Sequence, residues 1–540
     1  MNCPIEMKGD NIRNINHSAS APIHNILWVD DEIDVLEPHI LYLREKSFQV
    51  TPVTNGLDAL TLLDQYHYDA VILDQMMPGL DGISTLDRLR QIDTTIPVIM
   101  LTQIQDEPLV DEALSKRVAD FLIKPIGGVQ IASTLKRILH RTKIIEEQIP
   151  QSYTDDFNDI HNLINNQPDW KEWVKVYQKI TTWDLEFDPL SRTGLEETHQ
   201  ALKKEINTKF SDYVENNYPK WLKGKSGPLL SVDVLDHYVL PYLREEKPVH
   251  FIVVDCLRLD HWLTIESLLQ PYFYIDLNCY YSILPSATLY SRNALFSGLF
   301  PSQLADRFPE FWQEGADGET STNRYERQLL QWKIQEEGLQ LKPGLRYFKI
   351  FDAKGGDEFI RQATTFDQIT LSALVVNFID ILTHQRSESD LLQQIAPDQS
   401  AFCSLVKSWF SHSALFEILK IIAKQDAVVI LTSDHGSVLC NRPARAFGNR
   451  ETSTSLRFKV GNNLGCDRSQ SLYIDDPKQY KLPTGNLGKN YIIAKEDYYF
   501  VYPNQYNEYT RQFRGGFQHG GISPGELIIP IATMTPRGNS

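Results

Sequence analysis

The feature that most constrains this chain is a series of short apolar runs that each end in a polar or charged residue. Near the N-terminus the runs ILWVD, AVILD, PVIMLT and ADFLIKP alternate with amphipathic stretches such as LEPHILYLREK. This alternation of strands and helices predicts a parallel α/β sheet. After residue 230, the runs VHFIVVD, LVVNFID and AVVILTSD are apolar almost throughout, as expected of strands buried on both faces. The sequence therefore predicts two α/β regions.

The segment between these two regions carries no strand-like apolar run. Leu202, Ile206, Phe210, Val214 and Trp221 follow near-helical spacing, which predicts a helical bundle. The first 23 residues are poor in apolar side chains, and we expect a disordered tail there. The predicted division is a tail at 1–23, a first α/β domain at 24–145, a helical linker at 146–228 and a second α/β domain at 229–540.

Composition excludes several classes of protein. The net charge of −17 argues against a chain that coats DNA, because non-specific DNA binding needs cations that meet phosphates. No basic recognition helix stands out, so we do not expect a sequence-specific DNA binder. The sequence contains no run of 18 apolar residues, so we expect no membrane-spanning helix. The first 25 residues lack the apolar core of a signal peptide. Six cysteines without a paired motif indicate reduced thiols and a cytoplasmic location.

The first α/β region carries functional side chains where its strands are predicted to end. Asp30 and Asp31 follow the first run, Asp74 ends the third strand, Thr102 ends the fourth, and Lys124 follows the fifth. In a doubly wound sheet, such strand ends gather at one edge. Carboxylates form an oxygen site that suits Mg²⁺, and a hydroxyl and an ammonium can hold phosphoryl oxygens. One aspartate at a strand end is more often only a turn residue, so the prediction depends on all five together.

This region resembles the receiver domain of bacterial response regulators, a flavodoxin-like (βα)5 fold. The motifs are VDDE at 29–32, NGLDAL at 55–60, VILDQMMPGLDG at 71–82, IMLT at 99–102 and FLIKP at 121–125. The resemblance implies that a histidine kinase phosphorylates Asp74. The other positions that it implies are the magnesium ligands Asp30, Asp31 and Asp74 and the switch and phosphate-contacting residues Thr102, Phe121 and Lys124. A receiver-like fold that is never phosphorylated normally lacks one of the five polar positions, and none is missing here.

The C-terminal region carries aspartates and histidines in a pattern typical of metal ligands. The candidate ligands are Asp255, Asp380, His384, Asp434, His435 and His519. They supply the nitrogen and oxygen ligands that zinc accepts, enough for two ions. Asp380 and His384 can reach one ion if a helix begins there. Two neighbouring ions can polarise a phosphoryl oxygen and bind the attacking oxygen.

Thr288 lies just before a probable helix in LPSATLYSRNALFSG. A threonine hydroxyl is a poor nucleophile until metal coordination lowers its pKa. A helix N-terminus also favours a bound phosphate. Thr288 alone could equally be a helix cap, which is an ordinary role for threonine.

These residues together resemble the alkaline phosphatase superfamily, and more narrowly its PglZ branch, with VDCLRLDHW at 254–262 and SATLYSRNALFSG at 286–298. The resemblance implies a zinc-dependent phosphodiesterase or phosphatase with Thr288 as nucleophile and Ser286 as the competing candidate. The implied ligands are Asp255, Asp434, His435 and Thr288 for one zinc ion and Asp380, His384 and His519 for the other.

Other polar residues of this region have less certain roles. Asn293 could assist the phosphoryl oxygens, or it could be a helix-surface amide. Five arginines could meet substrate phosphates, although an exposed salt bridge is the commoner role; they are Arg292, Arg442, Arg445, Arg511 and Arg514. Asp260 and His261 also look like ligands, but no partner motif matches them, and we expect a structural role.

The order of the three regions resembles the PorX family of response regulators, which regulate the type IX secretion system. This resemblance implies a phosphodiesterase for nucleotides or oligonucleotides, a homodimer that forms on phosphorylation, and a sigma factor as a possible downstream partner. The alternative is a catalytically silent adaptor whose PglZ domain docks a kinase or a sigma factor. The complete set of ligand and nucleophile positions favours the enzyme.

Overall fold

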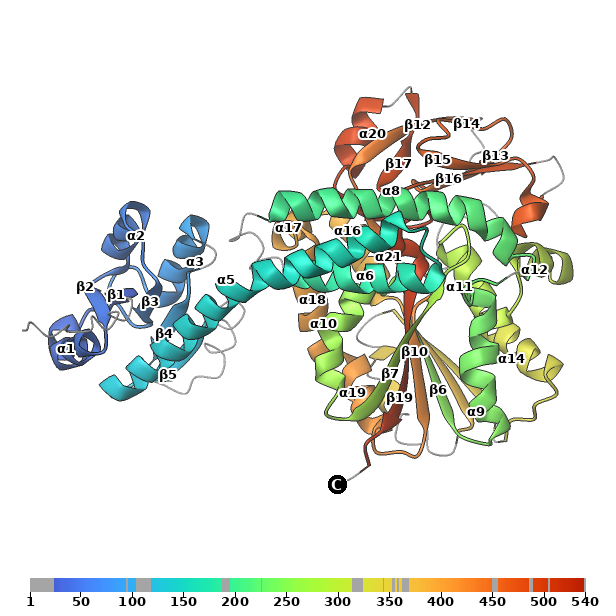
Figure 1. Cartoon of the computed structure of the whole chain (residues 1–540). Helices are drawn as coiled ribbons and strands as arrows, with labels where there is room; N and C mark the ends of the chain where they lie inside the picture. Colours follow the sequence, from blue (N-terminus) through green and yellow to red (C-terminus); the bar gives the residue numbers. More distant parts are fainter. Residues whose placement is uncertain are drawn as a thin grey trace, which may run out of the picture. The chain divides into compact units, whose positions relative to one another are not determined.

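The computed structural model describes residues 24–93, 96–102, 118–186, 195–224, 226–312, 324–342, 344–351, 355–356, 359–361, 369–448, 455–484, 489–503 and 506–538. The predicted disordered tail at 1–23 lies outside the described residues. The chain forms two compact units, Met1–Gln151 and Ser152–Ser540 (Figure 1). Within the described residues, no helix is both long and apolar enough to cross a bilayer.

The N-terminal unit is a parallel five-stranded sheet with the strand order β2-β1-β3-β4-β5. Its strands are β1 (His24–Val29), β2 (Phe48–Val53), β3 (Ala70–Asp74), β4 (Val98–Thr102) and β5 (Asp120–Ile123). Its helices are η1 (Ile33–Leu36), α1 (Glu37–Glu45), α2 (Gly56–Gln65), α3 (Gly82–Ile92) and the first part of α5 (Gly128–Asn165). The strand order is that of the flavodoxin-like fold, which confirms the predicted fold of this region.

The C-terminal unit begins with helices that share a hydrophobic core with the α/β region after them. These helices are the last part of α5, α6 (Trp170–Leu185) and α8 (Glu196–Trp221). Helix α6 begins at a capping box, in which Asp169 accepts from the backbone of Glu172 and Glu172 accepts from that of Asp169. The predicted helical middle region is thus confirmed. The ring of Phe210 on α8 packs against Trp173 on α6 and Tyr281 on β7. The helices therefore pack directly on the α/β region and share its hydrophobic core.

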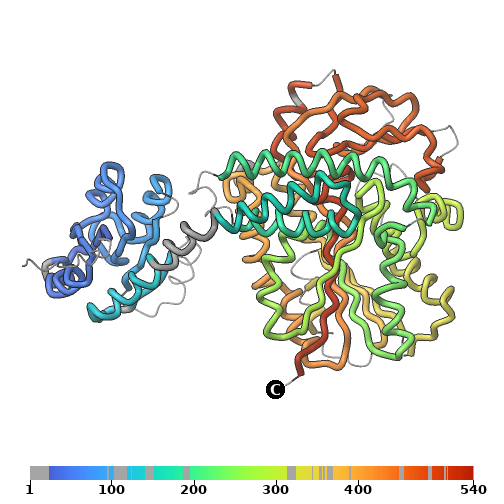
Figure 2. The backbone as a smooth tube through the Cα atoms, viewed as in Figure 1, coloured from blue at the N-terminus to red at the C-terminus, as the bar shows by residue number. Residues whose placement is uncertain are grey.

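The central sheet of this unit has six strands in the order β7-β19-β10-β6-β9-β8. Strands β10, β6, β9 and β8 run parallel, whereas β19 is antiparallel to both β10 and β7. Figure 2 shows the last strand, β19, in dark red; it is inserted between the edge strand β7 and β10. The strand bounds are β6 (Val249–Val254), β7 (Phe273–Tyr281), β8 (Leu345–Ile350), β9 (Leu371–Val376), β10 (Val428–Thr432) and β19 (Ile528–Pro536). This mixed sheet confirms the predicted larger α/β region.

Smaller elements complete the unit. Three small sheets have the strand orders β11-β18, β14-β12-β17 and β13-β16-β15. Their strands are β11 (Val438–Cys440), β12 (Arg442–Phe447), β13 (Phe458–Gly461), β14 (Gly465–Cys466), β15 (Ser471–Ile474), β16 (Asn490–Ala494), β17 (Tyr498–Val501) and β18 (Gly516–Gln518). The remaining helices are η2 (Ser231–Asp233), η3 (Leu235–Val239), α9 (Leu240–Arg244), α10 (Leu259–Leu269), α11 (Thr288–Ser297), α12 (Pro301–Arg307), α14 (Glu326–Glu336), α16 (Phe378–Glu388), α17 (Asp390–Ile395), α18 (Gln399–Ser411), α19 (Ala414–Ile422), η5 (Pro477–Tyr480), α20 (Tyr506–Phe513) and α21 (Pro524–Leu527).

A buried histidine of the central sheet makes the stability of this unit depend on pH. Burial lowers the pKa of His250 to about 4, below the ordinary value near 6.5. Between these values the unfolded chain binds a proton that the folded chain does not, so stability falls as pH falls. From pH 7 to pH 5 we expect His250 to cost on the order of 2 kcal/mol of stability. Replacing it by Gln should therefore flatten the pH dependence of the urea midpoint.

The matched control for this prediction is His412→Gln, because His412 is exposed. It should leave the pH dependence as in the wild type. If the stability of His250→Gln falls between pH 7 and pH 5 as steeply as that of the wild type, His250 is not the group responsible for the pH dependence. His250 Nδ1 lies 2.6 Å from the Ser372 hydroxyl, so a uniform destabilisation at both pH values is expected and does not count against it.

Candidate functional site

The N-terminal unit brings its three predicted magnesium ligands together. One carboxylate oxygen each of Asp30, Asp31 and Asp74 lies within 4.8 Å of the others, because β1 and β3 are parallel neighbours whose ends meet at one edge. Lys124 Nζ lies 2.8 Å from Asp30 Oδ2 and 3.0 Å from Asp74 Oδ1. Burial raises the pKa of Asp74, and the Lys124 ammonium opposes this shift. An all-oxygen site with an adjacent cation fits Mg²⁺ and a phosphoryl group.

The two remaining predicted receiver positions lie on the neighbouring strands. Thr102 is the last residue of β4, and Phe121 lies on β5, opposite Met100 of β4. Both side chains are partly buried. Their switching role stays a prediction, and the segment between these strands, residues 103–117, lies outside the described residues.

The C-terminal unit gathers its predicted ligands at the carboxyl edge of the central sheet. Asp255 follows β6, Asp434 and His435 follow β10, and Asn377 follows β9. These strands are parallel neighbours, so the residues after them lie together. The Ser433 hydroxyl also ties two strand ends, accepting from the backbone N–H of Leu257 at 2.9 Å and donating to the His435 carbonyl at 2.8 Å.

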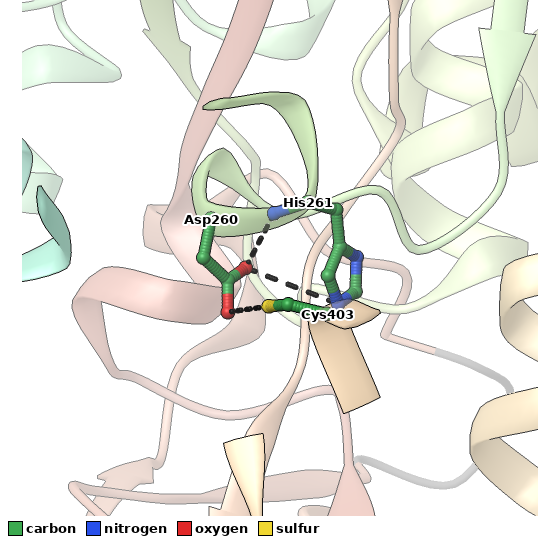
Figure 3. Close-up of side chains that lie close together, drawn as sticks. All are labelled: Asp260, His261 and Cys403. Atoms are coloured by element: carbon green, nitrogen blue, oxygen red, sulfur yellow. Dashed lines mark hydrogen bonds and ion pairs between the residues drawn. The ribbon is translucent and has the colours of Figure 1, made fainter. Parts of the chain in front are cut away.

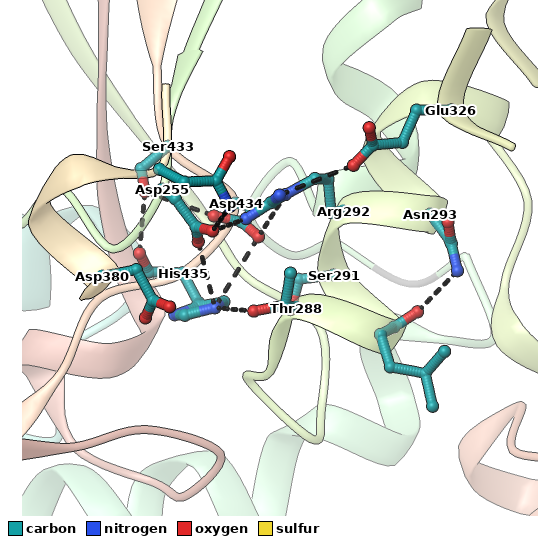
Figure 4. Close-up of polar contacts among 12 residues, drawn as sticks. Asp255, Thr288, Ser291, Arg292, Asn293, Glu326, Asp380, Ser433, Asp434 and His435 are labelled. Atoms are coloured by element: carbon teal, nitrogen blue, oxygen red, sulfur yellow. Dashed lines mark hydrogen bonds and ion pairs between the residues drawn. The ribbon is translucent and has the colours of Figure 1, made fainter. Parts of the chain in front are cut away.

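Asp255, Asp434 and His435 form the first ligand group, with one donor atom each within 4.8 Å of the others (Figure 4). All three are fully buried. Thr288 Oγ1 lies 2.9 Å from His435 Nε2. His435 Nδ1 lies 3.1 Å from the Gly436 carbonyl. A carbonyl only accepts, so Nδ1 carries the proton and Nε2 offers its lone pair, as a metal ligand must.

Asp380, His384 and His519 form a second group of the same size. The sequence predicted a strand that ends in Asp380, but β9 ends at Val376 and Asp380 lies on the first turn of α16. This placement puts His384 one turn further along, and its Nε2 lies 3.2 Å from that of His519. The His519 ring stacks on the His435 ring with centroids 4.2 Å apart, so the two ligand groups adjoin.

The buried carboxylates of the first group fit a metal ion. Asp255 Oδ2 accepts a hydrogen bond from Asn377 at 2.9 Å and contacts Arg292. Asp255 Oδ1 accepts none from the part of the chain that the structure describes. Burial raises the pKa of Asp255 to about 7. Burial also favours a raised pKa for Asp434, but the charges of Arg292 and His435 outweigh the effect of burial. They lower the pKa of Asp434 to about 2. An unbonded, buried carboxylate oxygen among nitrogen and oxygen donors suits zinc or a similar cation.

The nucleophile candidate is the first residue of helix α11, preceded by Ala287 in extended conformation. Thr288 is therefore not the cap, and its hydroxyl faces His435 rather than its own helix. The competing candidate, Ser286, donates its hydroxyl to the Gly521 carbonyl at 2.9 Å. Tyr218 of α8 accepts the backbone N–H of Leu284 at 2.9 Å, so the helical region holds the segment that leads to Thr288.

Two neighbours on α11 differ from their sequence-based roles. The structure does not bring Asn293 to the site, because its amide donates to the Leu289 carbonyl at 2.9 Å on the far side of the helix (Figure 4). Arg292 is not an exposed salt-bridge partner, because it is fully buried between Asp255 and Asp434. Sequence reasoning missed this role, as it did that of Asn377, and no local motif signals either one.

Of the other arginines, Arg442 and Arg445 contact residues outside the two ligand groups. Arg442 pairs with Glu496 and Asp497, and Arg445 lies 5.2 Å from the centre of the Tyr506 ring. The last two belong to the segment of α20: Arg511 within the helix and Arg514 directly after it.

Asp260, His261 and Cys403 form a further cluster of ligand-type atoms (Figure 3). Asp260 accepts from Arg258 Nε at 2.9 Å, from Gln399 at 2.8 Å and from the Cys403 thiol at 3.3 Å. His261 Nδ1 accepts the backbone N–H of Arg258 at 3.3 Å, so its Nε2 carries the proton. A saturated carboxylate, a protonated Nε2 and a thiol whose pKa burial raises do not fit a metal ion, and the cluster suits a structural role.

Comparison with known proteins gives three family matches along the chain. The response regulator receiver domain matches residues 26–136, the PorX response regulator linker domain matches 143–222, and the BREX system PglZ alkaline phosphatase-like domain matches 234–534. Together they define a response regulator whose receiver is followed by an alkaline phosphatase-like output domain. The chain belongs to the PglZ alkaline phosphatase-like family and is a PorX-type response regulator.

Three relatives each match a part of the chain. The transcriptional regulatory protein SrrA of Staphylococcus aureus, from strains NCTC 8325 / PS 47 and COL, is 28% identical over 166 residues, 29% of this chain and 68% of SrrA. The receiver domain of the Francisella response regulator 1452 is 29% identical and covers 22% of this chain and 98% of its own, with a TM-score of 0.21. The receiver domain of NtrX from Brucella abortus is 25% identical. It covers 21% of this chain and 98% of its own, also with a TM-score of 0.21.

The family assignment has direct consequences for function. A receiver domain implies a histidine kinase partner and a bound Mg²⁺. An alkaline phosphatase-like domain indicates a hydrolase, and the buried Asp and His groups can hold a metal ion.

Proposed function

We propose that the chain is a metal-dependent phosphodiesterase with Thr288 as its nucleophile, controlled by phosphorylation of Asp74. The observation that carries this proposal is the position of the Thr288 hydroxyl, 2.9 Å from His435 Nε2 at the start of α11. His435 belongs to one ligand group and stacks on His519 of the other. A hydroxyl beside two adjacent ligand groups is an arrangement that suits two-metal phosphoryl transfer.

In the proposed reaction the Thr288 oxygen attacks the phosphorus atom, and the bond from phosphorus to the leaving alcohol breaks. Water then cleaves the phosphothreonine and restores the hydroxyl. Asp255, Asp434, His435 and Thr288 would hold one zinc ion and Asp380, His384 and His519 the other. Bound zinc would lower the pKa of the attacking hydroxyl and neutralise charge on the phosphoryl oxygens. The helix N-terminus at Thr288 adds backbone N–H groups that favour an anion.

The substrate, the partners and the setting complete the proposal. We infer a nucleotide or oligonucleotide phosphodiester as substrate and regulation of type IX secretion as output. A histidine kinase would phosphorylate Asp74, the chain would form a homodimer in response, and a sigma factor would act downstream. The protein would work in the cytoplasm without reading DNA sequence. These inferences follow from the resemblance to the PorX family and from the charge balance.

Removal of metal tests the enzymatic part. Chelation of the purified protein should lower turnover of a chromogenic phosphodiester by about a hundredfold or more, because neither the hydroxyl nor the phosphoryl charge is then stabilised. The midpoint of thermal unfolding should fall as well, since a ligand that binds the folded state stabilises it. Zinc should restore both. The measurements are metal content, thermal unfolding and turnover of a diester beside a monoester.

The outcomes separate the two readings of the output domain. Turnover that survives in metal-free protein would overturn the metal mechanism. A protein that binds no metal and turns over neither ester would favour the silent adaptor, whose alkaline phosphatase-like domain only docks a partner. A strong preference for the monoester would replace the phosphodiester in the proposal by a phosphomonoester.

A further inference from the structure

Arg292 is a fully buried cation on the helix that begins with Thr288. It lies four residues after Thr288, so the two side chains share one face of α11. Its Nη2 contacts Asp255 Oδ2, and its Nε lies 3.0 Å from Asp434 Oδ2 (Figure 4). One guanidinium thereby joins the helix of the nucleophile to the ends of two central strands.

We propose that Arg292 is a positioning residue for the first ligand group, an inference that rests on the proposed metal-dependent function. The planar guanidinium has its donors in a fixed fork. By holding Oδ2 of Asp255, it directs Oδ1 of the same carboxylate toward His435, whose Nε2 lies 3.7 Å away. It also fixes Asp434 through Nε. The ligand atoms are thus oriented before an ion arrives.

The charges around Arg292 support this role. Asp255, Asp434 and Glu326 are three buried carboxylates, and Arg292 Nη1 lies 3.5 Å from Glu326 Oε1. Glu326 is held from its other side by Lys349, whose Nζ lies 3.2 Å from Oε2. Buried like charges repel one another unless a cation lies between them. Arg292 contacts all three carboxylates, so it offsets this repulsion and holds the two ligand carboxylates close together.

A direct role in substrate binding fits Arg292 less well. All three nitrogens of its guanidinium face carboxylates, and its side chain is 1% exposed. A phosphate would have to displace one of these carboxylates from a buried ion pair. Residues that hydrogen-bond to metal ligands orient those ligands, and their loss typically weakens metal affinity or activity 10- to 100-fold.

The test is a zinc titration of the chelated full-length protein in competition with a chromophoric chelator. Arg292→Lys keeps the charge but replaces the rigid fork of donors by a single ammonium on a flexible stem, which cannot hold the three carboxylates in the same orientation. It should weaken one of the two zinc sites by about 10- to 100-fold and leave the other unchanged. Asp380→Asn is the matched variant and should weaken the opposite site. Turnover should fall in Arg292→Lys through kcat more than through KM, because the substrate does not touch Arg292.

A second variant gives a test that does not depend on whether Arg292→Lys folds. Glu326→Gln leaves Arg292 in place but removes the negative charge of Glu326, which is not itself a proposed zinc ligand. We expect a few-fold weaker affinity at the same zinc site. If Arg292→Lys folds and binds two zinc ions as tightly as the wild type, the inference is overturned while the proposed function stands. If Arg292→Lys does not fold, unchanged zinc affinity in Glu326→Gln overturns it. Wild-type protein that binds no zinc would overturn both.

Discussion

Thr288→Ala is expected to lower diester turnover by at least about a thousandfold, which corresponds to about 4 kcal/mol of transition-state stabilisation. The substitution removes the attacking oxygen and one of the proposed ligands of the first metal. The second ligand group, built from Asp380, His384 and His519, is untouched, so bound zinc should be retained at that group. The measurement is steady-state turnover of a chromogenic diester together with metal content.

Two further variants identify the attacking oxygen. Thr288→Ser keeps a hydroxyl at the same place and should retain measurable turnover. Ser286→Ala tests the neighbouring hydroxyl, which donates to the Gly521 carbonyl rather than to a ligand residue. It should lose about 1 kcal/mol of stability but keep most of its turnover. If Ser286→Ala is the inactive variant and Thr288→Ala is active, the assignment of the nucleophile is wrong.

The central strands could be predicted because burial on both faces leaves a plain signal in the sequence. Strands β6, β9 and β10 are buried along their whole length, and each reads as an apolar run. Strands β2 and β7 lie at sheet edges and alternate between buried and exposed residues, so they show no such run. Strand β19 pairs on both sides, yet it contains Pro530, a residue that normally argues against a central strand.

The ligand types could be predicted for a related reason. Parallel strands end at one edge, so Asp255, Asp434 and His435 had to lie near one another once the strands were identified. The roles of Arg292 and Asn293 could not be predicted, because successive residues on a helix point about 100° apart. That rotation directs Arg292 into the strand ends and Asn293 back onto its own helix. Which face of α11 meets the sheet is a tertiary fact with no local signal.

Asp74→Asn is expected to abolish phosphorylation of the N-terminal unit. In the wild type, a carboxylate oxygen of Asp74 forms a bond to phosphorus while the bond to the donor breaks, giving an acyl phosphate. The amide of Asn is not a nucleophile for this step, and it removes one of the three carboxylates that fit Mg²⁺. Incubation with acetyl phosphate and Mg²⁺, followed by intact-mass spectrometry, should show a phosphoryl adduct on the wild type and none on the variant.

The matched control is Asp64→Asn, because Asp64 is exposed on α2 and lies outside the magnesium group. It should take up phosphate like the wild type. Any increase in dimer fraction or any change in diester turnover that follows phosphorylation should be absent in Asp74→Asn and present in Asp64→Asn. A phosphoryl adduct on Asp74→Asn would show that another residue is the acceptor. A response of turnover to acetyl phosphate in that variant would show that control of the output domain does not pass through Asp74.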